Sequence, residues 1–204
     1  MNPLNSIVGT IVAGVVLAVI IVLATLDAHI VGPIPVNSIV IWLHVLAGIT
    51  WIGLLYYFNF VQVPAMAEAA ADQGGPGGAG ISRYVAPRAL AWFRWGAVVT
   101  WLTGAGFLFH TGQLDDAFAL GQLTETTNRY ALTIGIGAWL GTIMLFNVWV
   151  LIWPNQKKIL GLVEASADQI ARAKRTAFLA SRTNTMLSIP MVMCMVGAGH
   201  GFFM

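Results

Sequence analysis

Apolar and polar positions divide this chain into five long apolar stretches joined by shorter polar segments. The stretches lie at about residues 6–26, 38–62, 91–111, 130–152 and 184–203. Each is long enough to cross the hydrocarbon core of a bilayer, which takes about 20 apolar residues in an α-helix. The pattern therefore predicts an all-α, polytopic membrane protein, a single transmembrane domain over residues 1–204 with five helices in a bundle.

Two of the connecting segments differ in their own patterns. The connection at 66–88 is rich in alanine and contains the run Gly74-Gly75-Pro76-Gly77-Gly78, which predicts a flexible loop. Residues 156–182 instead place apolar side chains such as Ile159, Val163 and Ile170 at helical spacing between charged ones. This periodicity predicts an amphipathic segment on the cytoplasmic membrane surface before the last span.

Composition supports the membrane assignment. The 204 residues are 58% hydrophobic and only 9% charged, whereas soluble domains carry roughly 25% charged residues. The formal net charge is +2, and the basic residues lie in the connections. Their roles in setting the membrane topology and in contacting lipid headgroups are sufficient to explain them. We therefore expect the lipid bilayer as a partner, and no nucleic acid.

The distribution of Lys and Arg predicts the orientation. Nine of the ten flank the second-to-third and fourth-to-fifth connections: Arg83, Arg88, Arg94, Lys157, Lys158, Arg172, Lys174, Arg175 and Arg182. The positive-inside rule assigns both connections to the cytoplasm. The N-terminus is then inside and the C-terminus outside.

With this topology the four histidines approach the outer face. His44 lies about 7 residues into the second stretch, roughly 10 Å below the boundary at 1.5 Å per residue. His110 ends the third stretch, His200 lies near the end of the last, and His29 falls in an outer loop. A polar ring at membrane depth is costly unless something binds it, so His44 is the strongest candidate for a functional residue.

Imidazoles on facing helices are typical ligands for haem iron, copper or zinc. We expect His44 and His200 to ligate the metal of a haem b, with His110 as a further cofactor-binding residue. Copper is a less favoured alternative, since the methionines of the last stretch are not spaced along one helix face. Small residues beside the histidines predict room for a macrocycle: Ala47, Gly48, Gly104, Gly106, Gly197, Ala198, Gly199 and Gly201. In the alternative interpretation these residues serve close helix packing and the histidines make ordinary hydrogen bonds.

Other chemistries lack support in the sequence. Cys194 is the only cysteine, which excludes a disulfide or a CxxC site within the chain. No nucleophile, base and orienting group form a recognisable hydrolase pattern. The five stretches contain no acidic residue of the kind that proton-coupled transport uses.

Several motifs resemble a known family. They are Trp42-Leu43-His44, Trp51-Ile52-Gly53 and Tyr57-Phe58 in the first half, and Asn147, Pro154-Asn155-Gln156-Lys157-Lys158, Ala173-Lys174-Arg175, Asn184, Ser188-Ile189-Pro190 and His200 in the second. Together they resemble the membrane-embedded N-terminal region of the bacterial cytochrome-linked urate oxidases (urate hydroxylases). The spacing from His44 to Trp51 is also weakly similar to HemJ-like protoporphyrinogen oxidases and CopD-like copper proteins.

The resemblance implies a multi-pass protein of the bacterial inner (plasma) membrane with a haem-type redox centre at His44 and His200. Those oxidases carry a cytochrome c domain with a CxxCH site, which this sequence lacks. We therefore expect an oxidoreductase component rather than a complete urate oxidase, with a c-type cytochrome or other membrane subunits as partners. Three functions stay open: an electron-transfer or redox-accessory subunit, a cofactor-free structural subunit of a respiratory or photosynthetic complex, and a urate-oxidase-like oxidoreductase component.

Overall fold

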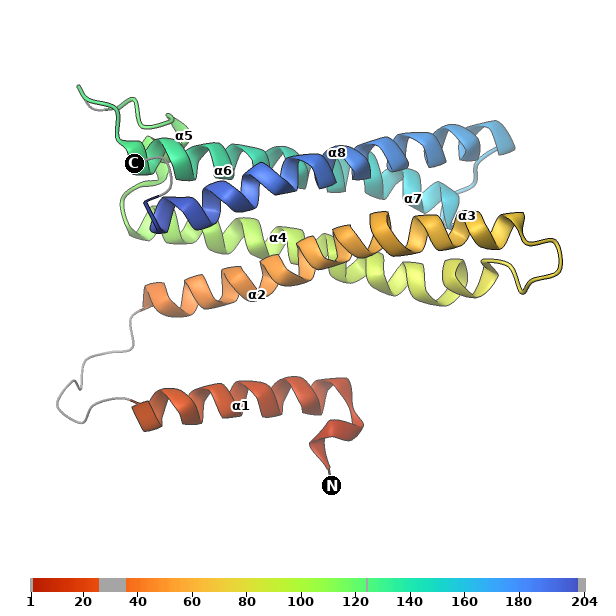
Figure 1. Ribbon diagram of the computed structural model, residues 1–204, viewed down its shortest axis with the longest axis horizontal. Helices are drawn as coiled ribbons and strands as arrows, with labels where there is room; N and C mark the ends of the chain where they lie inside the picture. Colours follow the sequence, from red (N-terminus) through yellow and green to blue (C-terminus); the bar gives the residue numbers. More distant parts are fainter. Residues whose placement is uncertain (1, 26–35, 124, 202–204) are drawn as a thin grey trace. The chain divides into compact units, whose positions relative to one another are not determined.

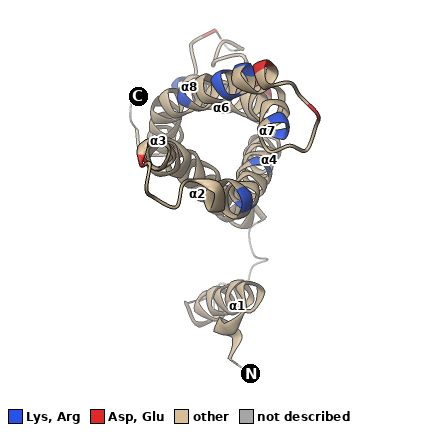
Figure 2. Ribbon diagram, turned by 90° about the vertical axis from the view of Figure 1, so that its right-hand side faces the viewer, with Lys and Arg blue, Asp and Glu red and all other residues tan. Residues whose placement is uncertain are grey.

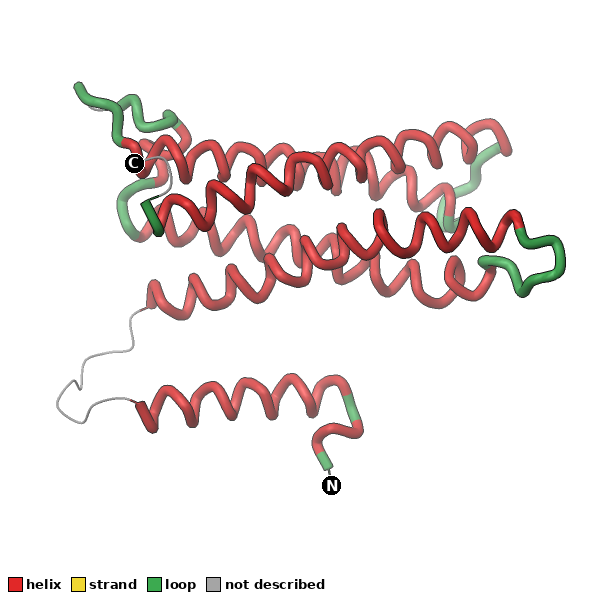
Figure 3. The backbone as a smooth tube through the Cα atoms, in the orientation of Figure 1, coloured by secondary structure: helices red, strands yellow, loops and turns green. Residues whose placement is uncertain are grey.

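The computed structural model describes residues 2–25, 36–123 and 125–201, and its regular structure is entirely helical (Figures 1 and 3). The predicted all-α class is confirmed for this part of the chain. The chain divides into two compact units, Met1–Pro35 and Val36–Met204. The first unit holds a short 3-10 turn, Pro3–Asn5, and the helix α1, Ile7–Thr25, none of whose residues is buried.

The second unit consists of two helical hairpins (Figure 1). The first hairpin runs outward through α2 (Val36–Tyr56), the π-helical η2 (Tyr57–Gln62) and α3 (Val63–Ala71), and returns through η3 (Ile81–Val85) and α4 (Ala86–His110). The short α5 (Leu114–Phe118) leads to the second hairpin. That hairpin contains α6 (Arg129–Phe146), the π-helical η4 (Asn147–Ile152), α7 (Trp153–Ile159) and the returning α8 (Ala167–Gly199).

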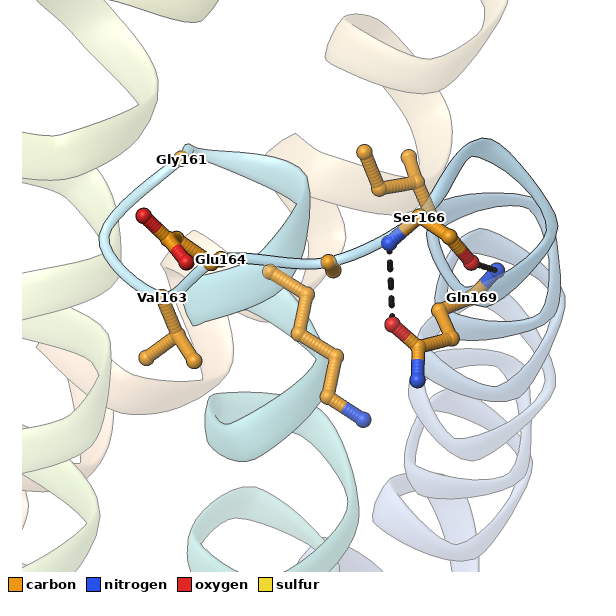
Figure 4. Close-up of a pocket in the computed structure, with 8 residues that line it drawn as sticks. Gly161, Val163, Glu164, Ser166 and Gln169 are labelled. Carbon is orange, nitrogen blue, oxygen red and sulfur yellow. Dashed lines mark hydrogen bonds between the residues drawn. The ribbon is translucent and has the colours of Figure 1, made fainter.

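The last helix differs from its prediction. We expected a surface segment at 156–182 followed by a span at 184–203, but α8 is one helix of 33 residues that begins at Ala167. A capping box starts it: Gln169 N–H donates to Ser166 Oγ, and Ser166 N–H donates to Gln169 Oε1 (Figure 4). The small residues Ala173, Ala177 and Ala180 in its first half are buried within the unit, whereas Leu179 is exposed. These alanines pack against other helices of the unit.

Each of the three described π-helical segments precedes a helix whose second residue is proline. The prolines are Pro64, Pro87 and Pro154. Proline lacks an N–H, and its ring clashes with the carbonyl four residues earlier. A widened π turn is a known way for a helix to accommodate such an interruption, so the rods continue without a break.

The two hairpins repeat each other with a spacing of ninety residues. Tyr57 and Asn147 begin the two six-residue π segments, and Pro64 and Pro154 follow at the same distance. The same spacing relates His110, the last residue of α4, to His200, the C-cap of α8. In each hairpin, therefore, a π-helical segment interrupts the outgoing helix, and the returning helix has a histidine at its C-terminal end.

Close helix packing builds the core of this unit. A Cβ atom at Gly96 would lie 3.3 Å from the backbone nitrogen of Trp51, so α4 approaches α2 at this glycine. Trp51, Leu55 and Phe93 are almost fully buried beside it, and many apolar side chains on the outside are exposed. Among the described residues, three helices are long and apolar enough to cross a membrane: Ile7–Thr25, Val36–Ala71 and Arg129–Ile159. These features are typical of a membrane protein.

Charge is unequally distributed between the two ends of the second unit. Lys and Arg colour the helices around the end that Figure 2 views, where α4 begins, α7 ends and α8 begins. Arg129, at the start of α6, lies at the opposite end. Most of the nine basic residues predicted for one side thus lie toward this end of the bundle, whereas Arg182 lies midway along α8.

The close approach at Gly96 makes a testable prediction. Gly96→Val places methyl groups against the backbone of α2, and overpacking of this kind costs about 1–3 kcal/mol. Gly106→Val, also in α4, is the matched control, since nothing lies within 4 Å of a Cβ atom there. We expect a lower thermal unfolding midpoint in detergent for Gly96→Val only. An equal loss in both variants would contradict the packing described here.

Candidate functional site

The His44 imidazole is bound to the neighbouring helix α4. Its Nδ1 lies 2.8 Å from the backbone oxygen of Thr100 and 3.4 Å from Thr103 Oγ1. Because a carbonyl oxygen only accepts, Nδ1 carries the hydrogen that it donates to Thr100. In the neutral ring Nε2 then holds the free lone pair, as a metal ligand requires.

Gly104 makes room for this ring. A Cβ atom at Gly104 would lie 2.8 Å from Cε1 and 3.1 Å from Nδ1 of His44, too close for a side chain. We expected this glycine to clear space for a macrocycle, but it clears space for the imidazole itself. A Cβ atom at Gly48 would lie 3.8 Å from Thr100 Cγ2, an ordinary contact distance, in keeping with the alternative of close helix packing.

His200 repeats part of this arrangement at the end of α8. It is the C-cap residue, is exposed, and its Nδ1 lies 2.8 Å from the backbone oxygen of Val196. The same reasoning places the hydrogen on Nδ1 and leaves Nε2 as the free acceptor. His110 is the exposed last residue of α4, and His29 lies outside the described residues.

The structure places these histidines toward one end of the bundle without joining them. α2 begins, and α4 and α8 end, at the same end of the unit (Figure 1). No hydrogen bond within the described ranges joins the rings of His44, His110 and His200. The described residues also contain no cluster of three or more His, Cys, Asp or Glu that could hold a metal ion. A haem needs only two axial side chains from the protein.

The methionines of α8 are dispersed. Met191 is buried in the core, whereas Met186 and Met193 are exposed. The sulfur atoms therefore do not form a continuous path along the helix, which disfavours a copper relay.

A buried polar cluster that the sequence analysis did not recognise lies midway along α8. Asn147 Nδ2 donates to Asn184 Oδ1 at 2.8 Å, and Asn184 Nδ2 donates to the Met144 carbonyl at 3.0 Å. Asn147 belongs to η4 and Asn184 to α8, and both side chains are buried. This pair links the outgoing and returning helices of the second hairpin.

The same face of α8 also binds the first hairpin. Asn59 Nδ2, in η2, donates to Ser181 Oγ at 2.8 Å and to the Leu55 carbonyl at 2.9 Å. Tyr56 and Ser188 hydroxyl oxygens are 3.0 Å apart. We call the six side chains the polar seam: Tyr56, Asn59, Asn147, Ser181, Asn184 and Ser188. The signal in the sequence was the row of polar residues at helical spacing, 181, 184 and 188, which lie on one face of a helix.

The Arg94 side chain of α4 lies against the ring of Trp153. Its guanidinium carbon lies 3.3 Å from the centre of the Trp153 ring at the start of α7, a cation–π contact. Next to it, Trp95 and Trp149 pack edge to face with their centroids 5.6 Å apart. These contacts connect α4 to the second hairpin near the basic end.

The second unit is therefore a bundle of two repeated hairpins, joined by a polar seam, with imidazoles near one end and basic residues at the other. The family model described as urate oxidase N-terminal matches the chain twice, over residues 35–120 and 116–204. The chain belongs to this family, and the resemblance inferred from its motifs is confirmed. The first match contains α2 to α5 and the second contains α6 to α8. No curated protein and no solved structure matches the chain.

The polar seam predicts a measurable coupling between Asn147 and Asn184. Either residue changed to alanine leaves a buried partner unsatisfied, at a cost of about 1–3 kcal/mol. The double variant should lose less than the sum of the two single variants, because both remove the same hydrogen bond. Unfolding in detergent with increasing denaturant measures all three free energies.

Asn155→Ala is the matched control for this cycle. Its amide donates to the Leu151 carbonyl within the same helical rod and links no second helix. We expect its effect to add independently to that of Asn184→Ala. Additive losses for Asn147 and Asn184 would show that their hydrogen bond does not stabilise the fold.

Proposed function

We propose that this chain is an integral membrane electron-transfer or redox-accessory subunit that holds a b-type haem near the outer face. His44 and His200 would be the axial ligands, and His110 a reserve ligand or a partner for a haem propionate. The proposal is supported by the family, whose name associates it with an oxidase, and by the tautomer of the His44 and His200 rings, in which Nε2 is free.

The observation that carries the proposal is the hydrogen bond from His44 to Thr100. Metal-binding histidines almost always donate their second ring N–H to a carbonyl, carboxylate or water, which fixes the tautomer and makes the ligating nitrogen more basic. His44 and His200 both donate from Nδ1 to a backbone carbonyl and leave Nε2 available. The donor chemistry of both residues therefore fits axial ligation of haem iron.

The surrounding residues would hold His44 in place before any cofactor is bound. Gly104 lets the ring lie against α4, and Thr103 and Thr100 restrict its rotation through the contacts to Nδ1. A fixed ligand loses little conformational entropy on binding. A haem held here would supply one-electron transfer, and the bundle would limit its exposure to water.

We further propose five membrane spans, with α4 and α8 as the third and fifth, in the inner membrane of a bacterium. The basic end would face the cytoplasm and the histidine end the outside, in agreement with the positive-inside rule. In this orientation the redox centre would lie within reach of a c-type cytochrome or of a larger membrane complex at the outer face.

Absorption spectroscopy tests the haem proposal. We expect the purified full chain to show a b-type α-band in the reduced-minus-oxidised spectrum. His44→Ala and His200→Ala should lose the band, because each removes one axial ligand, and His110→Ala should retain it. If His110→Ala lost the band and His200→Ala retained it, the second axial ligand would be His110 and not His200. Absence of haem and of copper from the unmodified protein would refute the redox function and favour a cofactor-free structural subunit.

Cysteine labelling tests the orientation. In a Cys194→Ser background, Asp72→Cys reports on the turn after α3 and Gln122→Cys on the opposite end of the unit. A membrane-impermeant maleimide added to intact spheroplasts should label Gln122→Cys and should reach Asp72→Cys only after permeabilisation. The reverse pattern would place the histidines at the cytoplasmic face.

A further inference from the structure

A cavity of about 740 Å³ opens between the two hairpins at the basic end of the second unit. It is lined by residues of η2, α3, α4, η4, α7 and α8, and by others from the segments that adjoin them. Its volume is in the range of small-molecule sites, which measure about 300–1,000 Å³. It lies away from His44, whose ring contacts α4 at Thr100 and Gly104.

The lining changes from apolar inside to basic outside. Phe58, Leu90 and Phe93 are buried and form part of the inner wall. Lys174 and Arg175, on the first turns of α8, are exposed and line the same cavity. Among the described residues of the lining, none is acidic, so these two charges meet no compensating carboxylate there. An amphiphile with an anionic head has the complementary pattern.

Gln62 supplies a second, independent indication of a ligand. Gln62 is one of the residues that line the cavity, and its Oε1 atom is buried and has no hydrogen-bond partner among the described residues. A buried acceptor without a donor costs about 1–3 kcal/mol. A bound molecule with a hydroxyl or ammonium donor would remove that cost.

We propose that this cavity binds an anionic amphiphile that carries a phosphate group and a hydrogen-bond donor, as an anionic phospholipid does. The phosphate would lie at Lys174 and Arg175, the donor would reach Gln62 Oε1, and the first part of an apolar chain would contact Phe58 and Phe93. Basic pockets between membrane helices bind anionic headgroups in this way. The site is separate from the histidines and does not depend on the presence of haem.

Native mass spectrometry of the purified full chain in neutral detergent measures the binding of added probes and tests the proposal. The probes are phosphatidylglycerol, which has an anionic phosphate and hydroxyl donors, phosphatidylcholine, which has no donor and no net charge, and inorganic phosphate. We expect phosphatidylglycerol to bind about tenfold more tightly than phosphatidylcholine. Equal affinity for the two lipids would overturn the proposal. If inorganic phosphate bound as tightly as phosphatidylglycerol, the ligand would be a free anion, and the proposal of an amphiphile would be wrong.

Variants separate a specific site from general surface charge. Lys174→Gln/Arg175→Gln should weaken phosphatidylglycerol binding about tenfold, to the level of phosphatidylcholine. Lys158→Gln/Arg172→Gln removes the same charge from the same end at residues that do not line the cavity, and should change binding less than about twofold. Equal weakening by both pairs would show nonspecific attraction and overturn the site.

Gln62→Met tests the hydrogen bond without changing charge. It should weaken phosphatidylglycerol about fivefold and leave phosphatidylcholine unchanged, since only the first lipid donates to Oε1. Thermal unfolding without lipid checks that the variant folds. A folded Gln62→Met variant with unchanged affinity for phosphatidylglycerol would refute the role of this acceptor.

Discussion

The hydrogen bonds that α8 makes to the π-helical segments η2 and η4 are the constraint on which the second unit depends. An amide inside a low-dielectric bundle must be paired, and Asn59, Asn147 and Asn184 are all buried. Asn59 reaches Ser181, and Asn147 reaches Asn184. A shift of α8 along its axis would break both hydrogen bonds together. This helix therefore holds the two hairpins in a fixed relative position.

The π-helical segments explain how the outgoing rods present these amides. Each of these two segments directly precedes a helix with proline at its second position, and the extra residue in a π turn rotates the side chains after it relative to a regular α-helix. Asn59 and Asn147 both lie within such turns. The sequence feature that disturbs the rod thus coincides with the residues that bind α8. Gln62 is the last residue of η2, so this π-helical segment also forms part of the cavity wall.

Much of this arrangement follows from the sequence alone. Apolar stretches of sufficient length predicted the helices, and helix offsets placed His44, His110 and His200 toward one end. The start of α8 was misjudged because charges in its first half resemble those of a surface helix, whereas the small residues Ala173 and Ala177 determine its packing. The role of Gly104 was also misjudged, since only the neighbouring helix reveals which group occupies its space.

The polar seam and the repeat were missed for different reasons. Hydrogen bonds between residues such as Asn59 and Ser181, 122 positions apart, leave no local pattern in the sequence. The repeat is detectable by comparison of the chain with itself, but few identical residues carry it, among them Pro64 with Pro154 and His110 with His200. The shared spacing of these pairs can be recognised as a structural repeat only when the π-helical segment before each proline is known.

The repeat also distinguishes which features belong to the architecture and which belong to one hairpin. The π turns, the prolines and the terminal histidines occur in both hairpins, so they are consistent with the geometry of the shared fold. His44 and Gly104 correspond, ninety residues later, to Ile134 and Cys194, which can form no equivalent imidazole contact. An imidazole that lies against a glycine and a carbonyl of the neighbouring helix is therefore found in the first hairpin and not at the equivalent positions of the second. The haem site proposed at His44 would account for a polar ring that the repeated fold does not require.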